Sequence, residues 1–206
     1  MGGESNERRG ALQPALLLLV LMIAAKPALA HVTAANMAGG FATGFLHPLT
    51  GPDHLLAMVS VGIWGAQLGA PAIWVLPIAF PLIMAVGGAL GVIGVPLPAT
   101  ELLIALSVLV LGLMVAQAKR LPLAVALAII AVFAIAHGHA HGAELPHSTD
   151  AVSFCVGFVM ATGLLHALGI TIGLLIRWPQ GALAIRGLGS LVATIGVYFV
   201  YVYAAV

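Results

Sequence analysis

The stretch His47-Pro48-Leu49-Thr50-Gly51-Pro52-Asp53-His54 interrupts an apolar run that extends from residue 32 to residue 70. As one straight helix, that run would be ~58 Å long at ~1.5 Å per residue, whereas the hydrocarbon core of a bilayer is ~30 Å thick. The two prolines and Gly51 lie where such a helix would break, because proline lacks a backbone N–H and glycine is conformationally free. The sequence therefore predicts a helix, a bend at the polar stretch and a second helix.

The composition of the whole chain is that of a membrane protein. Of its 206 residues, 62% are hydrophobic and 6% are charged, whereas a soluble domain carries ~25% charged residues. So few charges cannot cover a surface that faces water, and lipid is the expected solvent. Seven basic and six acidic residues form no basic patch, which excludes nucleic acid as a partner. The single cysteine, Cys155, excludes an intramolecular disulfide and a site built from several thiolates.

The N-terminal segment has the pattern of a secretory signal peptide. The pair Arg8-Arg9 precedes an apolar run from Ala15 to Ala25, and the small-residue tripeptide Ala28-Leu29-Ala30 follows. An uncleaved first transmembrane helix is the alternative, but this run is shorter than the ~20 residues that a span needs. We expect cleavage after Ala30, which divides the chain into a signal peptide, 1–30, and a polytopic transmembrane transporter domain, 31–206.

Further apolar segments predict the remaining spans of an all-α integral membrane protein. They cover residues 72–94, 100–118, 121–137, 151–176 and 183–205. With the broken first helix, they give about six transmembrane helices. The basic residues after the signal peptide are Lys119, Arg120, Arg177 and Arg186. Six crossings from an outside N-terminus leave all four on the cytoplasmic side, where positive charge is favoured. We therefore expect both mature termini to be periplasmic, in a bacterial inner membrane.

The polar stretch itself predicts a metal site made by His47, Asp53 and His54. A charged aspartate in a transmembrane helix costs several kcal/mol unless it is paired or hydrated. Imidazole nitrogen and carboxylate oxygen are suitable ligands for divalent nickel, cobalt, zinc or copper. Met58 lies one turn beyond His54 and is a further candidate ligand. The alternative interpretation is a structural histidine–aspartate pair at a kink.

A second histidine-rich motif, His137-Gly138-His139-Ala140-His141-Gly142-Ala143-Glu144, closes the fourth predicted span at its outer end. His137 and His141 are four residues apart, which puts two imidazoles on one helical face. The motif adds four candidate metal ligands: His137, His139, His141 and Glu144. We expect His139 and His141, with His147 beyond, at a hydrated outer mouth that gathers the ion, whereas His137 lies nearer the span and is assigned to neither group. The alternative is a hydrated loop that is rich in histidine without a function.

Two isolated histidines complete the candidates. His166 lies near the middle of the fifth predicted span, where a lone histidine either forms a hydrogen bond between helices or joins an ion path. His31 would be the first residue of the mature chain, where its amine and imidazole together could chelate a metal, although most N-terminal histidines have no such role.

With these motifs, the chain resembles the HupE/UreJ family of nickel permeases, which accompany hydrogenases and ureases. The matching motifs are His47-Pro-x-x-Gly-x-Asp-His-x-x-x-Met58, the histidine-rich motif up to Glu144, and the segment from Gly157 to His166. The resemblance covers essentially the whole chain. It implies a secondary, non-ATP permease for Ni²⁺, with Co²⁺ as a second candidate, in which His47, Asp53 and His54 are important. The metal is the transported substrate, and no cofactor is expected.

Two other functions stay open on the residues alone. An intramembrane metal-dependent enzyme would need a catalytic base or several carboxylates, but the sequence has no His-Glu-x-x-His motif, and Asp53 is the only acid deep in a predicted span. A metal-capture subunit of a larger transporter would bind the ion without moving it. We expect no enzymatic activity and a permease whose partners are the metal ion and membrane lipid. Through metal supply, it would be linked to hydrogenase or urease maturation.

Overall fold

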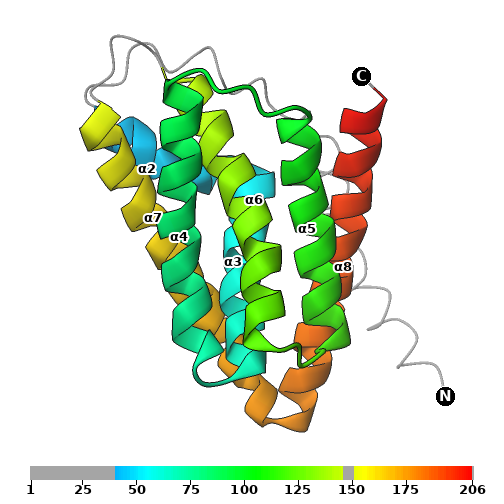
Figure 1. Ribbon diagram of the computed structural model, residues 1–206. Coiled ribbons are helices and arrows are strands. Elements are labelled where there is room, and N and C mark those ends of the chain that lie inside the picture. The colour runs from blue at the N-terminus through cyan, green and yellow to red at the C-terminus, as the bar shows by residue number, and fades with distance from the viewer. Residues whose placement is uncertain (1–39, 146–150, 206) are drawn as a thin grey trace, which may run out of the picture. The chain divides into compact units, whose positions relative to one another are not determined.

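Seven α-helices and one short 3-10 helix form the part of the protein that the structure describes. The structure is a computed structural model, and it describes residues 40–145 and 151–205, in which no strand occurs. In chain order the elements are α2 (Gly40–Thr50), α3 (Pro52–Leu68), α4 (Ala72–Val92), α5 (Thr100–Gln117), α6 (Leu123–Ala143), α7 (Ala151–Gly173), η1 (Leu174–Arg177) and α8 (Pro179–Ala204) (Figure 1).

Five of these helices are long and apolar enough to cross a membrane. They are Ala72–Val92, Thr100–Gln117, Leu123–Ala143, Ala151–Arg177 and Pro179–Ala204. The described part of the chain is therefore all-α, and its five long apolar helices agree with the multi-pass architecture that the sequence predicts. The predicted signal peptide, together with His31 and His147, lies outside the described residues.

The run predicted as a broken first span is divided between α2 and α3. The residue between the two helices, Gly51, is extended, with φ −82° and ψ 111°. Pro52 follows it in the first turn of α3, where its missing N–H would in any case have no intrahelical partner. α3 has 17 residues and is ~26 Å long, which is slightly less than the ~30 Å hydrocarbon core.

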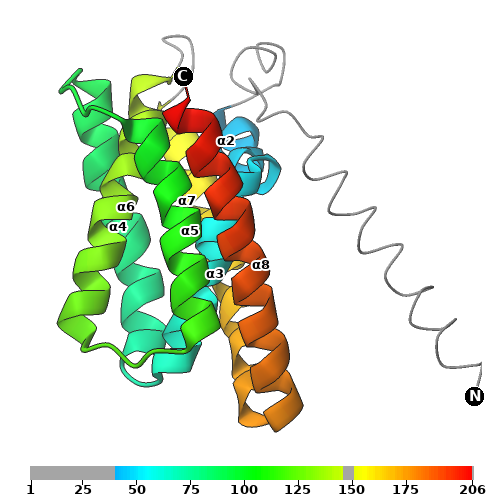
Figure 2. The same ribbon diagram turned by 90° about the vertical axis from the view of Figure 1, so that its right-hand side faces the viewer.

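α3 lies inside the bundle, as the two perpendicular views show (Figure 1; Figure 2). It packs against α4, α5, α7 and α8, and every residue from Ser60 to Gln67 is buried. A helix that is apolar on all sides is typically buried, with other helices covering its whole surface. This central position turns the N-terminal end of α3, which carries His54, toward α6 and α7.

The outer helices have two apolar faces, one for the protein core and one for lipid. On α4, Phe80 and Met84 are buried in the core. The large exposed side chains of α4 recur every four residues and are Trp74, Ile78, Leu82 and Val86. This spacing forms one helical stripe, and a stripe of exposed apolar side chains is suited to lipid.

Glycines set how closely α6 approaches α4. A Cβ atom at Gly138 would collide with the backbone carbonyl of Met84, and one at Gly142 would collide with the backbone of Gly88. Small residues at a helix interface let two backbones come into direct contact. Because Gly138 and Gly142 alternate with histidines, this contact also fixes the depth and rotation of the histidine-rich motif.

Candidate metal centre

His47 and His54 lie on either side of the α2–α3 break. His47 is in the last turn of α2, and His54 is in the first turn of α3. In a straight helix, residues seven apart are displaced by ~10.5 Å along the axis. In the structure the centroids of the two rings are 5.7 Å apart. The extended residue Gly51 therefore brings together two imidazoles that a continuous helix would hold further apart.

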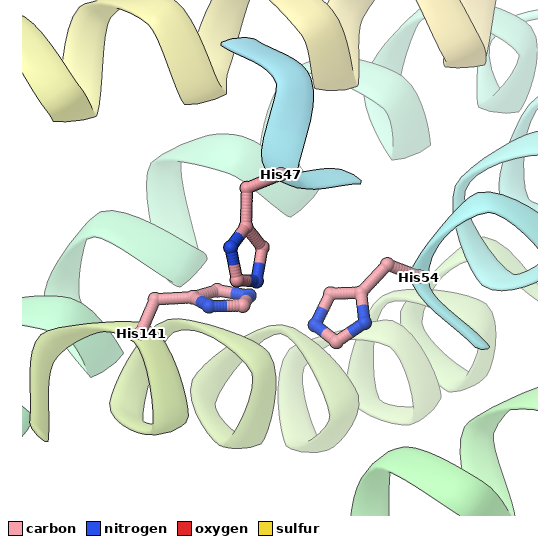
Figure 3. A group of neighbouring side chains, drawn as sticks. All are labelled: His47, His54 and His141. Carbon is pink, nitrogen blue, oxygen red and sulfur yellow. The ribbon is translucent and has the colours of Figure 1, made fainter. Parts of the chain in front are cut away.

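A third imidazole comes from α6. The ring centroid of His141 lies 4.5 Å from that of His47 and 4.7 Å from that of His54. One nitrogen from each ring can be chosen so that all three lie within 4.8 Å of one another. Figure 3 shows the three side chains converging from three separate helices. Nitrogen ligands bind transition metals at ~2.0–2.1 Å, so the three rings would have to move closer together for one ion to contact all three.

Asp53 contacts His54 rather than the centre of this cluster. Its Oδ1 atom accepts a hydrogen bond from the backbone N–H of His54 at 2.9 Å and lies 2.7 Å from Nδ1 of the same residue. A carboxylate accepts at this position, so Nδ1 carries a proton, and in the neutral imidazole Nε2 has the lone pair. Carboxylates that hold a metal-binding histidine in this way fix its tautomer and raise its basicity. The sequence predicted Asp53 as a ligand; in the structure its carboxylate contacts the backbone and the ring of His54.

His137 adds a fourth ring beside the cluster. Its centroid lies 4.9 Å from that of His54. Its Nδ1 lies 2.8 Å from the carbonyl oxygen of Phe133 and donates to it. Its Nε2 atom is buried and has no hydrogen-bond partner in the described part of the chain. His54 and His137 thus have the same arrangement, with a proton on Nδ1 and an unpaired Nε2.

The histidine-rich motif is not the hydrated mouth that the sequence predicted. α6 continues to Ala143, past the predicted end at residue 137, and His139 and His141 are each only 8% exposed. The physical reason is the close contact between α4 and α6 at Gly138 and Gly142, which keeps this turn helical and covered. His141 therefore belongs to the same site as His47 and His54.

The other candidate ligands have different surroundings. Nε2 of His139 donates to the carbonyl oxygen of Val95 at 2.6 Å, which directs this ring toward the linker after α4. Glu144 is exposed at the C-terminal end of α6. Met58 is fully buried in the hydrophobic core, one turn beyond His54. His166, on α7, donates from Nδ1 to the carbonyl oxygen of Pro77 on α4 at 3.1 Å.

The comparison with known proteins agrees with the motifs in the sequence. A family model described as HupE / UreJ protein matches residues 19–199. The chain is also 43% identical over 172 residues to a protein named Protein HupE from Rhizobium leguminosarum bv. viciae, an alignment that covers 84% of this chain and 90% of that protein. The chain belongs to the HupE/UreJ family. No solved structure matches this HupE/UreJ chain.

Aromatic rings line the histidine cluster of this HupE/UreJ protein, and sequence reasoning did not identify them. The centroid of Phe158 on α7 lies 4.5 Å from that of His141. The centroid of Phe80 on α4 lies 5.8 Å from that of His137. A phenylalanine in an apolar helix gives no signal in a single sequence, since most such residues face the core or lipid.

A cavity of about 320 Å³ lies beside the cluster in this HupE/UreJ protein, between α4, α6 and α7. Its lining includes His141 but is otherwise almost entirely apolar, with Met84, Phe154 and Phe158 among the contributing side chains. Apolar walls cannot replace the hydration shell of a divalent cation. This cavity is therefore unsuitable as a route for the ion.

Proposed function

We propose that the protein is a secondary permease that moves Ni²⁺ across the inner membrane into the cytoplasm, with Co²⁺ as a second substrate. The observation that carries this proposal is the convergence of His47, His54 and His141 from three helices, with donor nitrogens within 4.8 Å. Ionisable side chains inside a membrane bundle mark ion pathways, because their burial is otherwise unfavourable. Here they gather at one point.

The donor set fits a transported transition metal. Three imidazoles without a thiolate suit Ni²⁺, Co²⁺, Cu²⁺ or Zn²⁺, whereas Mg²⁺ and Ca²⁺ prefer oxygen ligands. Neutral ligands compensate the ion for lost water without the strong retention that several thiolates would give, so release stays feasible. Nickel as the main substrate rests on the resemblance to the nickel permeases of the family. Metal supply to hydrogenase or urease maturation is the corresponding physiological role.

The distribution of charge supports inward movement. Successive helices alternate in direction, so the linker after α5, which carries Lys119 and Arg120, lies at the same end of the bundle as Arg177 in η1. The α2–α3 break and the C-terminal end of α8 lie at the other end. Positive residues favour the cytoplasmic side. This orientation puts the histidine cluster near the periplasmic end, where an ion would enter.

The two alternatives are less favoured by the geometry. A metal-dependent hydrolase needs a base that can activate water, but the nearby carboxylate, Asp53, is engaged with both the backbone and the ring of His54. A capture subunit would need the same histidines, and only a flux measurement separates it from a permease. We therefore propose that the protein is not an enzyme.

Uptake of ⁶³Ni²⁺ by the purified protein alone in liposomes, with the interior negative, is the deciding experiment. We expect saturable accumulation that is lost in His141→Ala and largely kept in His139→Ala. These two variants remove the same side chain from the same helix, but only His141 belongs to the cluster. Nickel binding without flux would contradict the permease and favour a capture subunit. Equal loss in both variants would contradict the assigned site.

A further inference from the structure

The segment Pro77-Ile78-Ala79-Phe80-Pro81 of α4 contains two prolines four residues apart. In a helix, the N–H of residue 81 would bond to the carbonyl of residue 77, but proline has no N–H. The carbonyl of Pro77 is therefore free to accept a bond from another helix. Nδ1 of His166 on α7 lies 3.1 Å from it and donates its proton there.

This bond leaves His166 with an unpaired donor atom for a metal. The proton on Nδ1 places the lone pair on Nε2, the atom that is buried without a hydrogen-bond partner in the described part of the chain. His166 is 1% exposed. Thr162, one turn earlier on α7, is 0% exposed, and its Oγ1 atom is also unpartnered. Buried polar atoms without partners are rare in proteins and point to an occupant such as an ion or water.

His166 lies deeper in the bundle than the three-histidine cluster. A Cβ atom at Gly62 of α3 would collide with the backbone carbonyl of His166, so these residues are at the same level. Gly62 is two turns beyond His54, which corresponds to ~12 Å along the helix axis. One ion cannot be bound by His166 and by the three-histidine cluster at the same time.

The ring of Phe80 is close both to His166 and to His137, which lies beside the three-histidine cluster. It is fully buried, and its centroid lies 5.8 Å from that of His137 and 5.5 Å from that of His166. Both neighbours meet it at steep interplanar angles of 69° and 84°. Phe80 therefore has ring contacts both with His137, which lies beside the three-histidine cluster, and with His166, which lies level with Gly62.

We propose that His166 is a second, inner ligand position for the transported divalent cation, which reaches it from His137 past the ring of Phe80. The Pro77 carbonyl, freed by Pro81, holds the imidazole so that Nε2 faces the ion. This inference rests on the proposed permease function. The inference adds a second binding step, at His166, between binding of the ion at the three-histidine cluster and its release.

A change of ligand type tests the inner position directly. A buried thiolate prefers soft ions such as Cd²⁺, whereas imidazole suits Ni²⁺. In a Cys155→Ser background, His166→Cys should raise the ratio of Cd²⁺ to Ni²⁺ uptake in liposomes above that of the Cys155→Ser parent. If His166 only links α7 to α4, both rates will fall together and the ratio will stay constant, which would overturn the proposal.

A binding measurement keeps this test separate from the proposed function. Purified Cys155→Ser protein should show no thiolate-to-Cd²⁺ absorption band, and the added His166→Cys change should produce one. If the parent protein moves no nickel but the band appears, the permease function fails and the inner ligand position stands. If the parent moves nickel and no band appears, only the inner position is wrong.

Pro81→Ala tests how the ring is positioned without removing it. Alanine restores an N–H that can bond to the Pro77 carbonyl and displace His166. We expect the maximal nickel uptake rate to fall by roughly tenfold, the range seen when a supporting contact of a metal ligand is lost. The double variant Pro81→Ala/His166→Ala should be no slower than His166→Ala alone, because both changes remove the same contribution, the binding of the ion by a correctly held His166 ring. Additive losses would contradict positioning through Pro77.

Discussion

Oδ1 of Asp53 lies 2.7 Å from Nδ1 of His54, and the same oxygen accepts the backbone N–H of His54. The carboxylate therefore contacts both the ring and the first turn of α3, and in the proposed metal site it leaves Nε2 of His54 for the ion. As a proposed positioning residue for the three-histidine cluster, Asp53 leads to a graded prediction.

Asp53→Asn should weaken nickel binding less than Asp53→Ala does. The amide oxygen of asparagine can still accept the Nδ1–H bond, so ring orientation is kept while the effect of the negative charge is lost. We expect a loss of roughly tenfold for Asn and up to roughly 100-fold for Ala, measured by titration calorimetry on the purified protein. Identical losses in the two variants would instead indicate that Asp53 contacts the ion itself.

The three clustered histidines should act as one site. His47→Ala, His54→Ala and His141→Ala should each reduce nickel affinity by at least roughly tenfold, which is ~1.4 kcal/mol, because each removes one of three converging nitrogens. His139→Ala should change the affinity much less, since its Nε2 bonds to the Val95 carbonyl. The same calorimetric titration measures all four. A His141 variant with normal affinity would show that α6 contributes no ligand.

The contact between α4 and α6 should be intolerant of a single added methyl group. In Gly138→Ala, the new Cβ would collide with the Met84 carbonyl, and overpacking of this kind costs about 1–3 kcal/mol. Gly163→Ala is the matched control, because its Cβ would meet nothing within 4 Å. Thermal unfolding in detergent should show a clear loss for Gly138→Ala only. Equal unfolding temperatures would argue against direct backbone contact.

The proposed orientation can be tested with single cysteines in a Cys155→Ser background. Pro98 and Arg120 are both exposed in linkers at opposite ends of the bundle. A membrane-impermeant maleimide should label Pro98→Cys but not Arg120→Cys in intact spheroplasts, because positive residues favour the cytoplasm. After the membrane is permeabilised, both should react. Labelling of Arg120→Cys alone in intact spheroplasts would contradict the proposed orientation and indicate the opposite one.

The sequence by itself determined the class of the molecule and the approximate positions of its apolar helices, although α6 continues past its predicted end to Ala143. An apolar composition with few charges requires helices that satisfy their own backbone hydrogen bonds in lipid. Helix ends follow local chemistry, so Gly51 and Pro52 correctly predicted the α2–α3 break, whereas Pro48, also expected at the break, lies inside α2. The motifs that contain His47, His54 and His141 also determined the family. These signals are local in the chain, and a single sequence carries them.

Only the tertiary structure decided which candidates share a site. Helical spacing pairs His141 with His137, but it does not say which histidine meets His47 and His54; in the structure His139 bonds to a linker carbonyl, and His141 joins His47 and His54. Likewise, the partner of His166 is a carbonyl on α4 that Pro81 leaves free. In a membrane bundle both the lipid face and the core face of a helix are apolar, so periodicity does not reveal its rotation. Contacts between glycines and facing backbones set that rotation, and they exist only after the helices have packed.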